Sequence, residues 1–508
     1  MRLSALLEGM PVRLDSGPDP EVADLGADSR EIAPGWAFVA LRGEKSDGAE
    51  FIPQALERGA CAVFSEGTPN LPPGIASCRF EGEPRPIMAA LARRLHGQPD
   101  AALALIGVTG TNGKTTTTML IRQLLRGAGK GCGLIGTVMN AAGDREEEAV
   151  RTTPESPGFY RWLRRSVEAG DLASAVEVSS HALCLDRVAG ARFRVGVFTN
   201  LTQDHLDYHP SMQAYFQAKM RLFDERLKTD GVAVVNTRDM QGIQVASAMR
   251  ARSTRVISYG EAGSGADLVV LERIPHAQGQ TLKLSAFGTA YQVQAPVAGA
   301  FQAENILCAL GLAVGTGVPV DRAIAGVARL ASVPGRLELA AVLANGATVY
   351  VDYAHTPDAL QNVLRSVRPH VGAKDKLHVL FGCGGDRDPG KRPIMGRIAE
   401  ELSDCVWVTD DNPRTEDPDA IRKQVLSGAT GAAPATNAGP RREALQLALC
   451  ALRPGDVLVV AGKGHEDYQV VLERDAAGLP LQDSRGRPVT KKIPFSDARV
   501  IREIIASM

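Results

Sequence analysis

The 508-residue chain is predicted to be an α/β protein made of three domains. A chain of this length is too long for one hydrophobic core, and domains of ordinary size divide it into about three. Short apolar runs of strand length alternate with helical stretches, which indicates a mainly parallel sheet. Near residue 110 a strand, a glycine-rich turn and a helix follow one another, which is the order of a phosphate-binding loop.

The first segment is expected to be a small α/β domain over residues 1–88. It mixes short strands, glycine turns and one helix at about 48–58. A proline-rich piece, "GEPRP", separates it from a helix that ends near His96.

The central segment, residues 89–334, alternates strands and helices. Such an alternation forms a right-handed, mainly parallel sheet. Residues 267–297 are expected to add short antiparallel strands to it. The candidate strands of the sheet lie at 103–108, 133–138, 174–179, 195–201 and 231–236.

The third segment, residues 335–508, begins at the turn "VPGR" and is predicted to be a Rossmann-like α/β domain. Apolar runs in "KLHVLFGCGG", "CVWVTDDNP" and "DVLVVAGKG" each end in a polar loop rich in glycine or proline. Ligands of open α/β sheets bind at the carboxyl ends of the strands. These three loops are therefore the expected binding site of the third domain.

The composition argues against several classes of function. The formal net charge is −1, so no bulk charge indicates binding of nucleic acid or of a membrane. The eight cysteines are scattered without CxxC pairs, which favours reduced thiols in a cytoplasm over disulfides or a zinc site. No window holds the roughly 18 apolar residues of a membrane span. A cytoplasmic protein that is not inserted in a membrane is expected.

The stretch "GVTGTNGKTTTT" at 107–118 has the features of a cradle for nucleotide phosphates. Gly110 and Gly113 would let the backbone approach the phosphates closely. The helix that follows would offer free N–H groups and the positive end of its dipole. Lys114 would reach the terminal phosphates, and Thr115 would hold Mg²⁺.

The spacing departs from the strict phosphate-loop motif, because Val108 stands where that motif has a glycine. A glycine-rich turn without any ligand is the alternative interpretation. The lysine–threonine pair after a well-formed strand favours the phosphate loop.

Two polar stretches follow neighbouring candidate strands. Glu177 opens "EVSSHALCLDR" and is either a solvated carboxylate or a metal ligand. The second interpretation is favoured, because Mg²⁺ beside a phosphate loop often takes a carboxylate from an adjacent strand end. The loop "FTNLTQDHLDYH" carries His205, although Mg²⁺ prefers oxygen ligands to a histidine nitrogen.

Lys219 lies on or beside the apolar face of a helix expected at 213–227. Phe216, Met220, Phe223 and Leu227 form that face. Such a lysine usually extends its ammonium to water along the apolar surface. The alternative is a lysine that points into the site, where it is either paired or chemically modified.

Eight motifs in this order make the chain resemble the Mur ligase family, over essentially its whole length. They are "GVTGTNGKTT", "EVSSH", "FTNLTQDHLDYH" with "QAKMRLF", "VPGRLE", "DYAHTPDAL", "GCGGDRDPGKRPIM", "DNPR" and "GKGHEDYQ". The resemblance implies an N-terminal UDP-binding domain, a central ATP-binding domain and a C-terminal amino-acid-binding domain. It implies ATP and Mg²⁺ as cofactors, and a monomer is expected.

The resemblance also implies the reaction, which belongs to peptidoglycan synthesis. ATP phosphorylates the D-glutamate carboxylate of UDP-N-acetylmuramoyl-L-alanyl-D-glutamate. An amine of meso-diaminopimelate then attacks the acyl phosphate, and amide, ADP and phosphate result. Transfer of a phosphoryl group between two anions requires neutralisation of their charge, which two Mg²⁺ ions and a lysine supply.

Each matching residue acquires an implied role. The phosphates are held by Gly110, Thr111, Asn112, Gly113, Lys114, Thr115 and Thr116. The metal ligands are Thr115, Glu177, His205 and Lys219, the last as its carbamate. Asn305, Arg336, Asp352 and His355 lie around the rest of the nucleotide. The UDP-muramoyl dipeptide contacts Ser29, Thr152, Thr153, Ser179, Arg187 and Lys219. Diaminopimelate contacts Arg387, Asp411, Asn412, Arg414, Gly462 and Glu466.

The motif "DNPR" is the family's signature for diaminopimelate. This amino acid has a second carboxylate, which the guanidinium of Arg414 can hold with two parallel hydrogen bonds. A solvated loop arginine is the alternative. The sequence departs from the family at Leu185, where a glutamine is common, and at Gln302, which replaces an asparagine.

Four other functions remain as alternatives. The least expected is a non-catalytic binding module, because all the charge-neutralising residues are present. The lysine-adding sister ligase differs in the loops of the third domain. A folylpolyglutamate synthetase would share the phosphate loop and the lysine at position 219. It would lack the N-terminal uridine domain and the motif "DNPR". A GTPase switch would need an N-K-x-D motif, which "NTRD" at 236–239 matches weakly.

Overall fold

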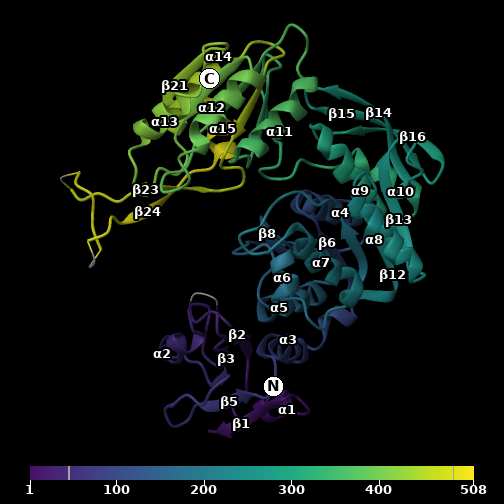
Figure 1. The fold of residues 1–508 in the computed structure, drawn as a ribbon, viewed down its shortest axis with the longest axis vertical. Coiled ribbons are helices and arrows are strands. Elements are labelled where there is room, and N and C mark those ends of the chain that lie inside the picture. The colour runs from purple at the N-terminus through teal and green to yellow at the C-terminus, as the bar shows by residue number, and fades with distance from the viewer. Residues whose placement is uncertain (44–45, 477, 484–485) are drawn as a thin grey trace. The chain divides into compact units, whose positions relative to one another are not determined.

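The structure, a computed structural model, describes residues 1–43, 46–476, 478–483 and 486–508 (Figure 1). Contacts between residues divide the chain into two compact units. The first unit comprises Met1–Val269, Ala286–Gly288 and Asn305–Gly326, and the second comprises Val270–Ser285, Thr289–Glu304 and Val327–Met508. In the part of the chain that is described, no helix is both long enough and apolar enough to cross a membrane.

The first unit begins with a small sheet in the order β1-β5-β4-β3-β2. β1 runs antiparallel to β5, whereas the other neighbours are parallel. Phe38, Ile52 and Val63 belong to the buried cluster that joins the short helix to this sheet. The elements are α1 (Leu3–Leu7), β1 (Val12–Ser16), β2 (Asp24–Gly26), β3 (Trp36–Val39), a 3₁₀ turn (Gly48–Phe51), α2 (Ile52–Glu57), β4 (Ala62–Ser65), β5 (Ala76–Phe80) and α3 (Pro84–Leu95).

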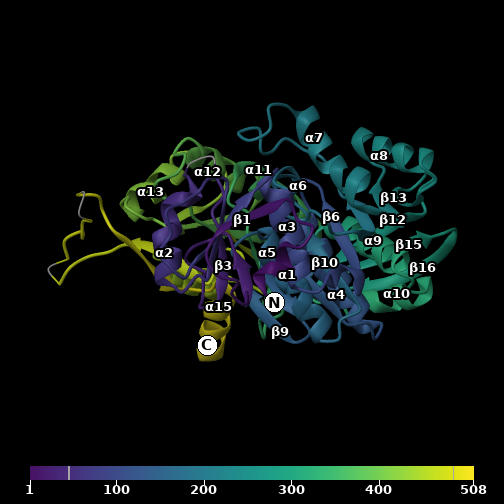
Figure 2. The same ribbon diagram turned by 90° about the horizontal axis from the view of Figure 1, so that it is seen from below.

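The central sheet of the first unit has the order β13-β12-β11-β6-β10-β7-β8-β9. β10 and β11 pair in parallel with the two edges of β6, so three strand ends meet at one place. α8 lies beside β12 and β13 (Figure 2). The elements are a 3₁₀ turn (Pro99–Ala101), β6 (Ala104–Thr109), α4 (Lys114–Gly127), β7 (Cys132–Ile135), β8 (Met139–Ala142), β9 (Arg145–Glu148), α5 (Ser156–Glu168), β10 (Ala173–Glu177), α6 (Ser180–Cys184), β11 (Phe193–Phe198), α7 (Met212–Arg221), β12 (Leu227–Asn236), α8 (Met240–Ala251) and β13 (Arg255–Glu261).

Several expected elements end earlier than their apolar patterns indicated. The strand expected to reach residue 179 ends at Glu177, because Ser179 caps α6 and accepts a hydrogen bond from the Ala182 N–H. The helix expected at 213–227 is α-helical only to Arg221 and continues as a π-helix over Leu222–Arg226. Leu227 already belongs to β12, where it pairs with Phe193 of β11.

The elements that follow β13 are divided between the two units: most of β14, β15 and β16 belongs to the second, and most of α9 and α10 to the first. β14, β15 and β16 are consecutive strands of the sheet that contains β13. They lie within residues 267–297, where short strands were expected. The elements are β14 (Leu268–His276), β15 (Gly279–Ala286), β16 (Thr289–Ala295), α9 (Ala300–Gly315) and α10 (Val320–Val327).

The last part of the second unit is a doubly wound sheet in the order β17-β18-β22-β19-β20-β21. Leu360, Met395 and Ile421 show that α11, α12 and α13 share one buried cluster, whereas Leu445 and Ile501 place α14 and α15 in another. Helices on both faces of this mainly parallel sheet make the domain Rossmann-like, as predicted. The elements are β17 (Glu338–Val342), β18 (Thr348–Asp352), α11 (Pro357–Val367), a 3₁₀ turn (Arg368–His370), β19 (Leu377–Phe381), α12 (Lys391–Leu402), β20 (Cys405–Thr409), α13 (Pro418–Leu426), β21 (Ala435–Gly439), α14 (Arg441–Ala451), β22 (Val457–Ala461), β23 (Tyr468–Leu472), β24 (Thr490–Pro494) and α15 (Asp497–Ser507).

A buried ion pair fastens α14 and α15 to this sheet. Both Arg441 and Asp497 have fully buried side chains, and their two hydrogen bonds are each 2.7 Å long. Arg441 also donates to the carbonyl oxygen of Asp410, which follows β20, and to that of Ala461, the last residue of β22. The pair therefore fixes two of the strand-end loops that were expected to form the binding site.

Asp497→Ala is expected to lower the free energy of unfolding by about 3–5 kcal/mol, because it leaves a buried guanidinium without its counter-charge. The control is Glu503→Gln, which breaks the exposed pair between Arg442 and Glu503 on the same two helices and costs at most about 1 kcal/mol. Urea unfolding of the three proteins measures both values. Equal stability of the two variants would contradict the structural role of the buried pair.

Candidate active site

The glycine loop between β6 and α4 has a backbone that only glycine fits at two positions. Gly110 and Gly113 have φ angles of +144° and +84°. A Cβ on Gly110 would lie 1.9 Å from Thr199 Oγ1, and one on Gly113 would lie 2.7 Å from Asn305 Oδ1. Lys114 folds back over the loop and donates to the carbonyl oxygens of Gly110 (3.0 Å) and Thr111 (2.7 Å). Asn305 thus lies against the loop, and its role at the nucleotide stays a prediction.

Glu177 is buried at the end of β10 and faces the first turn of α4. Its side chain is 1% exposed and accepts a hydrogen bond of 3.0 Å from the hydroxyl of Thr115. Thr137 donates to the same carboxylate through its N–H (2.8 Å) and its hydroxyl (3.0 Å). A hydroxyl oxygen beside carboxylate oxygens is the kind of ligand set that Mg²⁺ prefers. The residues present therefore fit the predicted metal, and the ligand roles of Thr115 and Glu177 stay predictions.

Lys219 is also buried at this loop, with an exposure of only 1%. Its Nζ donates to the Gly110 carbonyl (2.8 Å) and lies 4.1 Å from the centroid of the Tyr215 ring. Burial, and next the nearby Lys114, lower its pKa well below the ordinary value. The interpretation of a lysine that extends to water is therefore wrong, because α7 packs this side chain against the loop.

His205 is the least enclosed of the predicted metal ligands. Its side chain is 41% exposed, and its ring lies edge-on to His181 and Tyr215 at centroid distances of 4.9 and 6.0 Å. Among the described residues, no group of three or more His, Cys, Asp or Glu side chains has an arrangement that could hold a metal ion. The ligand role of His205 stays a prediction.

The residues predicted to contact the dipeptide lie together beside Glu177. Thr153 is fully buried and donates to the Glu177 carbonyl (2.6 Å), and its own carbonyl accepts a hydrogen bond from Arg187 (3.1 Å). The Thr152 hydroxyl lies 3.0 Å from that of Thr137. Ser179 Oγ lies 3.5 Å from the Thr153 hydroxyl. This group extends the candidate site from Glu177 to Ser179, the residue that caps α6.

A cavity of about 820 Å³ in the first unit has Arg151 and Pro154, the residues on either side of Thr152 and Thr153, in its wall. Ser29 lines it and donates to Gln54 (2.6 Å). The arginines in its wall are Arg30, Arg85, Arg151, Arg161 and Arg165. The wall also holds an equal number of carboxylates, those of Asp28, Glu31, Glu147, Glu148 and Glu155. Arg30, Arg85 and Arg165 are each paired with one of them, so the cavity is highly charged but carries no excess of positive charge.

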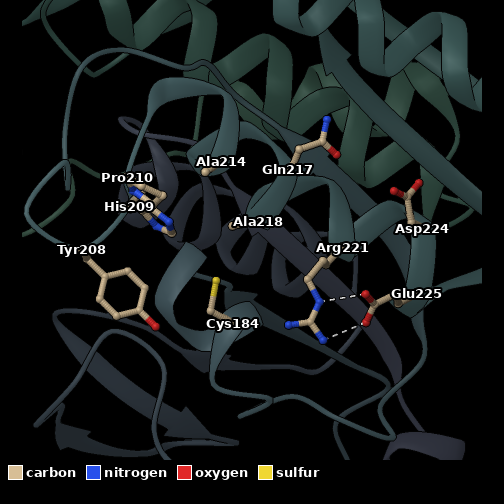
Figure 3. A pocket seen from close by; sticks show the side chains of 10 residues that line it. All are labelled: Cys184, Tyr208, His209, Pro210, Ala214, Gln217, Ala218, Arg221, Asp224 and Glu225. Atoms are coloured by element: carbon tan, nitrogen blue, oxygen red, sulfur yellow. Dashed lines mark hydrogen bonds and ion pairs between the residues drawn. The ribbon is translucent and has the colours of Figure 1, made fainter. Parts of the chain in front are cut away.

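Another hollow, of about 620 Å³, lies along α7. Figure 3 shows Arg221 directed toward Glu225, with Cys184, Tyr208 and His209 around the same space. None of the predicted site residues lines it. Its size alone therefore gives no reason to treat it as the reaction site.

The nucleotide residues predicted in the second unit lie around the start of the C-terminal sheet. Asp352 accepts hydrogen bonds from the backbone N–H groups of Leu337 (2.8 Å) and Ala354 (2.9 Å). Burial raises its pKa, and the charge of Arg336 opposes that shift. His355 is exposed and lies next to this group. Gln302, which departs from the family pattern, is buried and donates to the Arg336 carbonyl (3.1 Å). This hydrogen bond gives it a structural role.

Most of the predicted amino-acid-binding residues meet at the strand ends of β20 and β22. Asp411 and Asn412 are buried, and the Asn412 amide donates to Glu466 (3.1 Å). Gly462 has φ +112° and lies close to the Asp411 carboxyl group. Arg414 donates to the Gly385 carbonyl (2.7 Å) on the loop after β19. Arg387, on that same loop, is exposed.

Two buried cations of this region had no predicted role. Arg392 of α12 is 1% exposed, and it binds Glu416 (2.8 and 2.9 Å) and the Gly384 carbonyl (3.0 Å). Lys463 has no exposed surface and lies between the carboxylates of Asp411 and Glu466. Arg392 lies in the motif "GCGGDRDPGKRPIM" and Lys463 in "GKGHEDYQ". The burial of these two side chains could not be predicted, because a basic residue in a polar stretch is usually exposed.

The lysine that turns back onto a glycine loop between a parallel strand and a helix is the phosphate-binding arrangement of P-loop proteins. The fold and this loop thus define a P-loop α/β protein. Comparison with known proteins narrows the class, and the chain belongs to the Mur ligase family. The models that match are "Mur ligase family, catalytic domain" at residues 21–105, "Mur ligase middle domain" at 108–313 and "Mur ligase, glutamate ligase domain" at 335–464.

Relatives resemble the chain over its full length. A protein of Mesorhizobium japonicum is 42% identical over 475 residues, which are 93% of this chain and 96% of the relative. One of Gloeobacter violaceus is 42% identical over 510 residues, with 100% and 98% covered. Both are named UDP-N-acetylmuramoyl-L-alanyl-D-glutamate–2,6-diaminopimelate ligase.

Solved structures agree with this relationship. A structure of a ligase with that same name is 30% identical, has a TM-score of 0.69 and covers 100% of this chain and 99% of its own. The MurF ligase of Thermotoga maritima in complex with ADP is 20% identical, with a TM-score of 0.61 over 86% of this chain and 93% of its own, and shows the shared fold. The predicted fold class, a small N-terminal α/β domain, a central P-loop sheet and a C-terminal α/β domain, is confirmed. The boundaries at residues 88 and 334 stay predictions.

Proposed function

We propose that this protein is the ATP-dependent ligase that joins meso-diaminopimelate to UDP-N-acetylmuramoyl-L-alanyl-D-glutamate in peptidoglycan synthesis. The observation that carries the proposal is the convergence of Lys114 and Lys219 on the Gly110 carbonyl, beside the Thr115–Glu177 pair. Relatives that match the whole chain carry the name of this activity. The reaction places the protein in the cytoplasm, where ATP is available, and links it to cell shape and cell division.

The chain's own residues suit transfer of a phosphoryl group to a carboxylate. A carboxylate is a poor electrophile at neutral pH, so the D-glutamate carboxylate must first gain a leaving group. It attacks the γ-phosphorus of ATP, and the resulting acyl phosphate is attacked by the amine of diaminopimelate, which releases phosphate. Lys114 and the loop N–H groups would stabilise the negative charge on the transferred group. Mg²⁺, held by Thr115 and Glu177, would neutralise charge on the phosphate oxygens.

Lys219 suits conversion to a carbamate. Its lowered pKa favours the neutral amine, whose lone pair can attack the carbon of CO₂ with loss of one proton. The product is an anionic oxygen ligand, so a costly buried ammonium is replaced by a group that can bind a metal together with His205.

The remaining predicted residues divide among the three substrates. Ser29, Thr152, Thr153, Ser179 and Arg187 would bind the UDP-muramoyl dipeptide, and of these Ser29 lines the cavity of the first unit. Asn305, Arg336, Asp352 and His355 would surround the nucleotide. Arg387, Asp411, Asn412, Arg414, Gly462 and Glu466 would bind diaminopimelate, with Arg414 on its second carboxylate.

The test is phosphate release by the purified protein with ATP, Mg²⁺ and the UDP-muramoyl dipeptide, with either meso-diaminopimelate or L-lysine added. Turnover is expected with diaminopimelate alone. Arg414→Ala is expected to raise the KM for diaminopimelate by about tenfold or more, because it removes a charge-assisted contact to the second carboxylate. Turnover of the wild type with lysine alone would favour the sister ligase, and no turnover with either amine would refute the proposal.

A further inference from the structure

The second unit contains a lysine that water does not reach. Lys463 lies directly after β22, in the glycine-rich loop, and its side chain has no exposed surface. Its Nζ lies 3.2 Å from Asn412 Oδ1, 3.4 Å from Glu466 Oε2 and 3.5 Å from Asp411 Oδ1. Burial of an ammonium is costly unless it is paired and hydrogen-bonded. These contacts supply that compensation.

The contacts of Lys463 join loops that come from two strands. Asp411 and Asn412 follow β20, whereas Lys463 and Glu466 follow β22. The Asn412 amide is oriented at both ends, because its Oδ1 also accepts from the Val470 N–H (2.9 Å) and its Nδ2 donates to Glu466. One ammonium therefore fixes the side chains of all three neighbours at once.

The charges of this cluster do not cancel. Two carboxylates, those of Asp411 and Glu466, share a single ammonium, which leaves a net charge of −1. Without Lys463 the two carboxylates would repel each other and would move apart. With Lys463 they stay close together and retain one negative charge, which suits the ammonium group of an amino-acid substrate.

We infer that Lys463 is a positioning residue for the amino-acid substrate, acting through Asp411, Asn412 and Glu466 without touching the substrate itself. This inference rests on the proposed function, in which those three residues bind diaminopimelate. Lys463 neutralises one of the two carboxylates in this cluster, and the ammonium group of the substrate would neutralise the other. Arg414, whose guanidinium is held by the Gly385 carbonyl, lies outside this cluster and remains available for a carboxylate.

The test uses Lys463→Gln and Lys463→Met in the full-length enzyme. The glutamine keeps a donor for Asn412 and Glu466 and preserves the fold, but lacks the charge. We expect the KM for diaminopimelate to rise about tenfold or more in this variant, since one partner of a buried charge cluster is lost. The KM values for ATP and for the UDP-muramoyl dipeptide are expected to stay unchanged. The fold-change in kcat at saturating diaminopimelate is expected to be smaller than the fold-change in the KM for diaminopimelate. The methionine variant shows a larger rise.

Asp456→Asn is the matched control, at the opposite end of the same strand. Asp456 is buried before β22 and accepts hydrogen bonds from the N–H groups of Lys376 and Arg453, both 2.8 Å long. This variant is expected to melt at a lower temperature with all three KM values unchanged. An unchanged KM for diaminopimelate in folded Lys463→Gln, or an equal rise of all three KM values, would overturn the inference. Absence of turnover in the wild type would instead refute the proposed function.

Discussion

Lys219→Ala is expected to lower turnover by about 10²- to 10³-fold or more, the range found when a charge-stabilising group is removed from an active site. The side chain is buried against the Gly110 carbonyl, and the alanine removes both its ammonium and the carbamate that it would form. Acetate or formate is expected to restore part of the activity, because a small carboxylate can occupy the position of the lost carbamate. Steady-state phosphate release with and without these anions measures both effects.

Lys228→Ala is the control for this experiment. Lys228 lies in β12, on the chain segment that follows α7, and it is only half-buried. It is expected to retain wild-type turnover and to show no response to acetate. Full activity of Lys219→Ala without added carboxylate would remove Lys219 from the mechanism.

Glu177→Gln is expected to lower kcat by about 10²- to 10³-fold and to raise the Mg²⁺ concentration needed for half-maximal rate. The substitution keeps the shape of the side chain but removes its charge. It also places an amide NH₂ group where the Thr115 hydroxyl and the Thr137 groups now donate. Titration of turnover with Mg²⁺ separates loss of metal affinity from loss of the chemical step.

Glu168→Gln is the matched control, since Glu168 forms an exposed ion pair with Arg164 at the end of α5. Its kcat and its Mg²⁺ requirement are expected to equal those of the wild type. A Mg²⁺ requirement that is unchanged in Glu177→Gln would contradict the assignment of this carboxylate as a metal ligand.

The sequence was sufficient to predict the parts of the site that depend on strand ends. Glu177 and the phosphate loop follow neighbouring parallel strands, and parallel strands bring their carboxyl ends to one edge of a sheet. The three polar loops of the last domain were predicted by the same reasoning, and β20, β19 and β22 are indeed adjacent.

The burial of particular lysines could not be predicted in this way. The helical pattern placed Lys219 only near an apolar face, and its contact with Gly110 depends on how α7 packs against a distant loop. Lys463 gave no signal because its partners Asp411 and Asn412 come from another strand end. The change from α- to π-helix at Leu222 is likewise a tertiary effect. Leu227 must leave the helix because it begins β12 and pairs with Phe193 of β11.

The central claim is that the site transfers the γ-phosphoryl group of ATP to a carboxylate. The most direct measurement uses UDP-N-acetylmuramoyl-L-alanyl-D-glutamate labelled with ¹⁸O in the carboxylate that becomes the amide. One carboxylate oxygen leaves with the phosphoryl group when the amine attacks the acyl phosphate. Mass spectrometry of the released phosphate is therefore expected to show one ¹⁸O atom for each turnover with meso-diaminopimelate. Amide formation that releases unlabelled phosphate would contradict the claim.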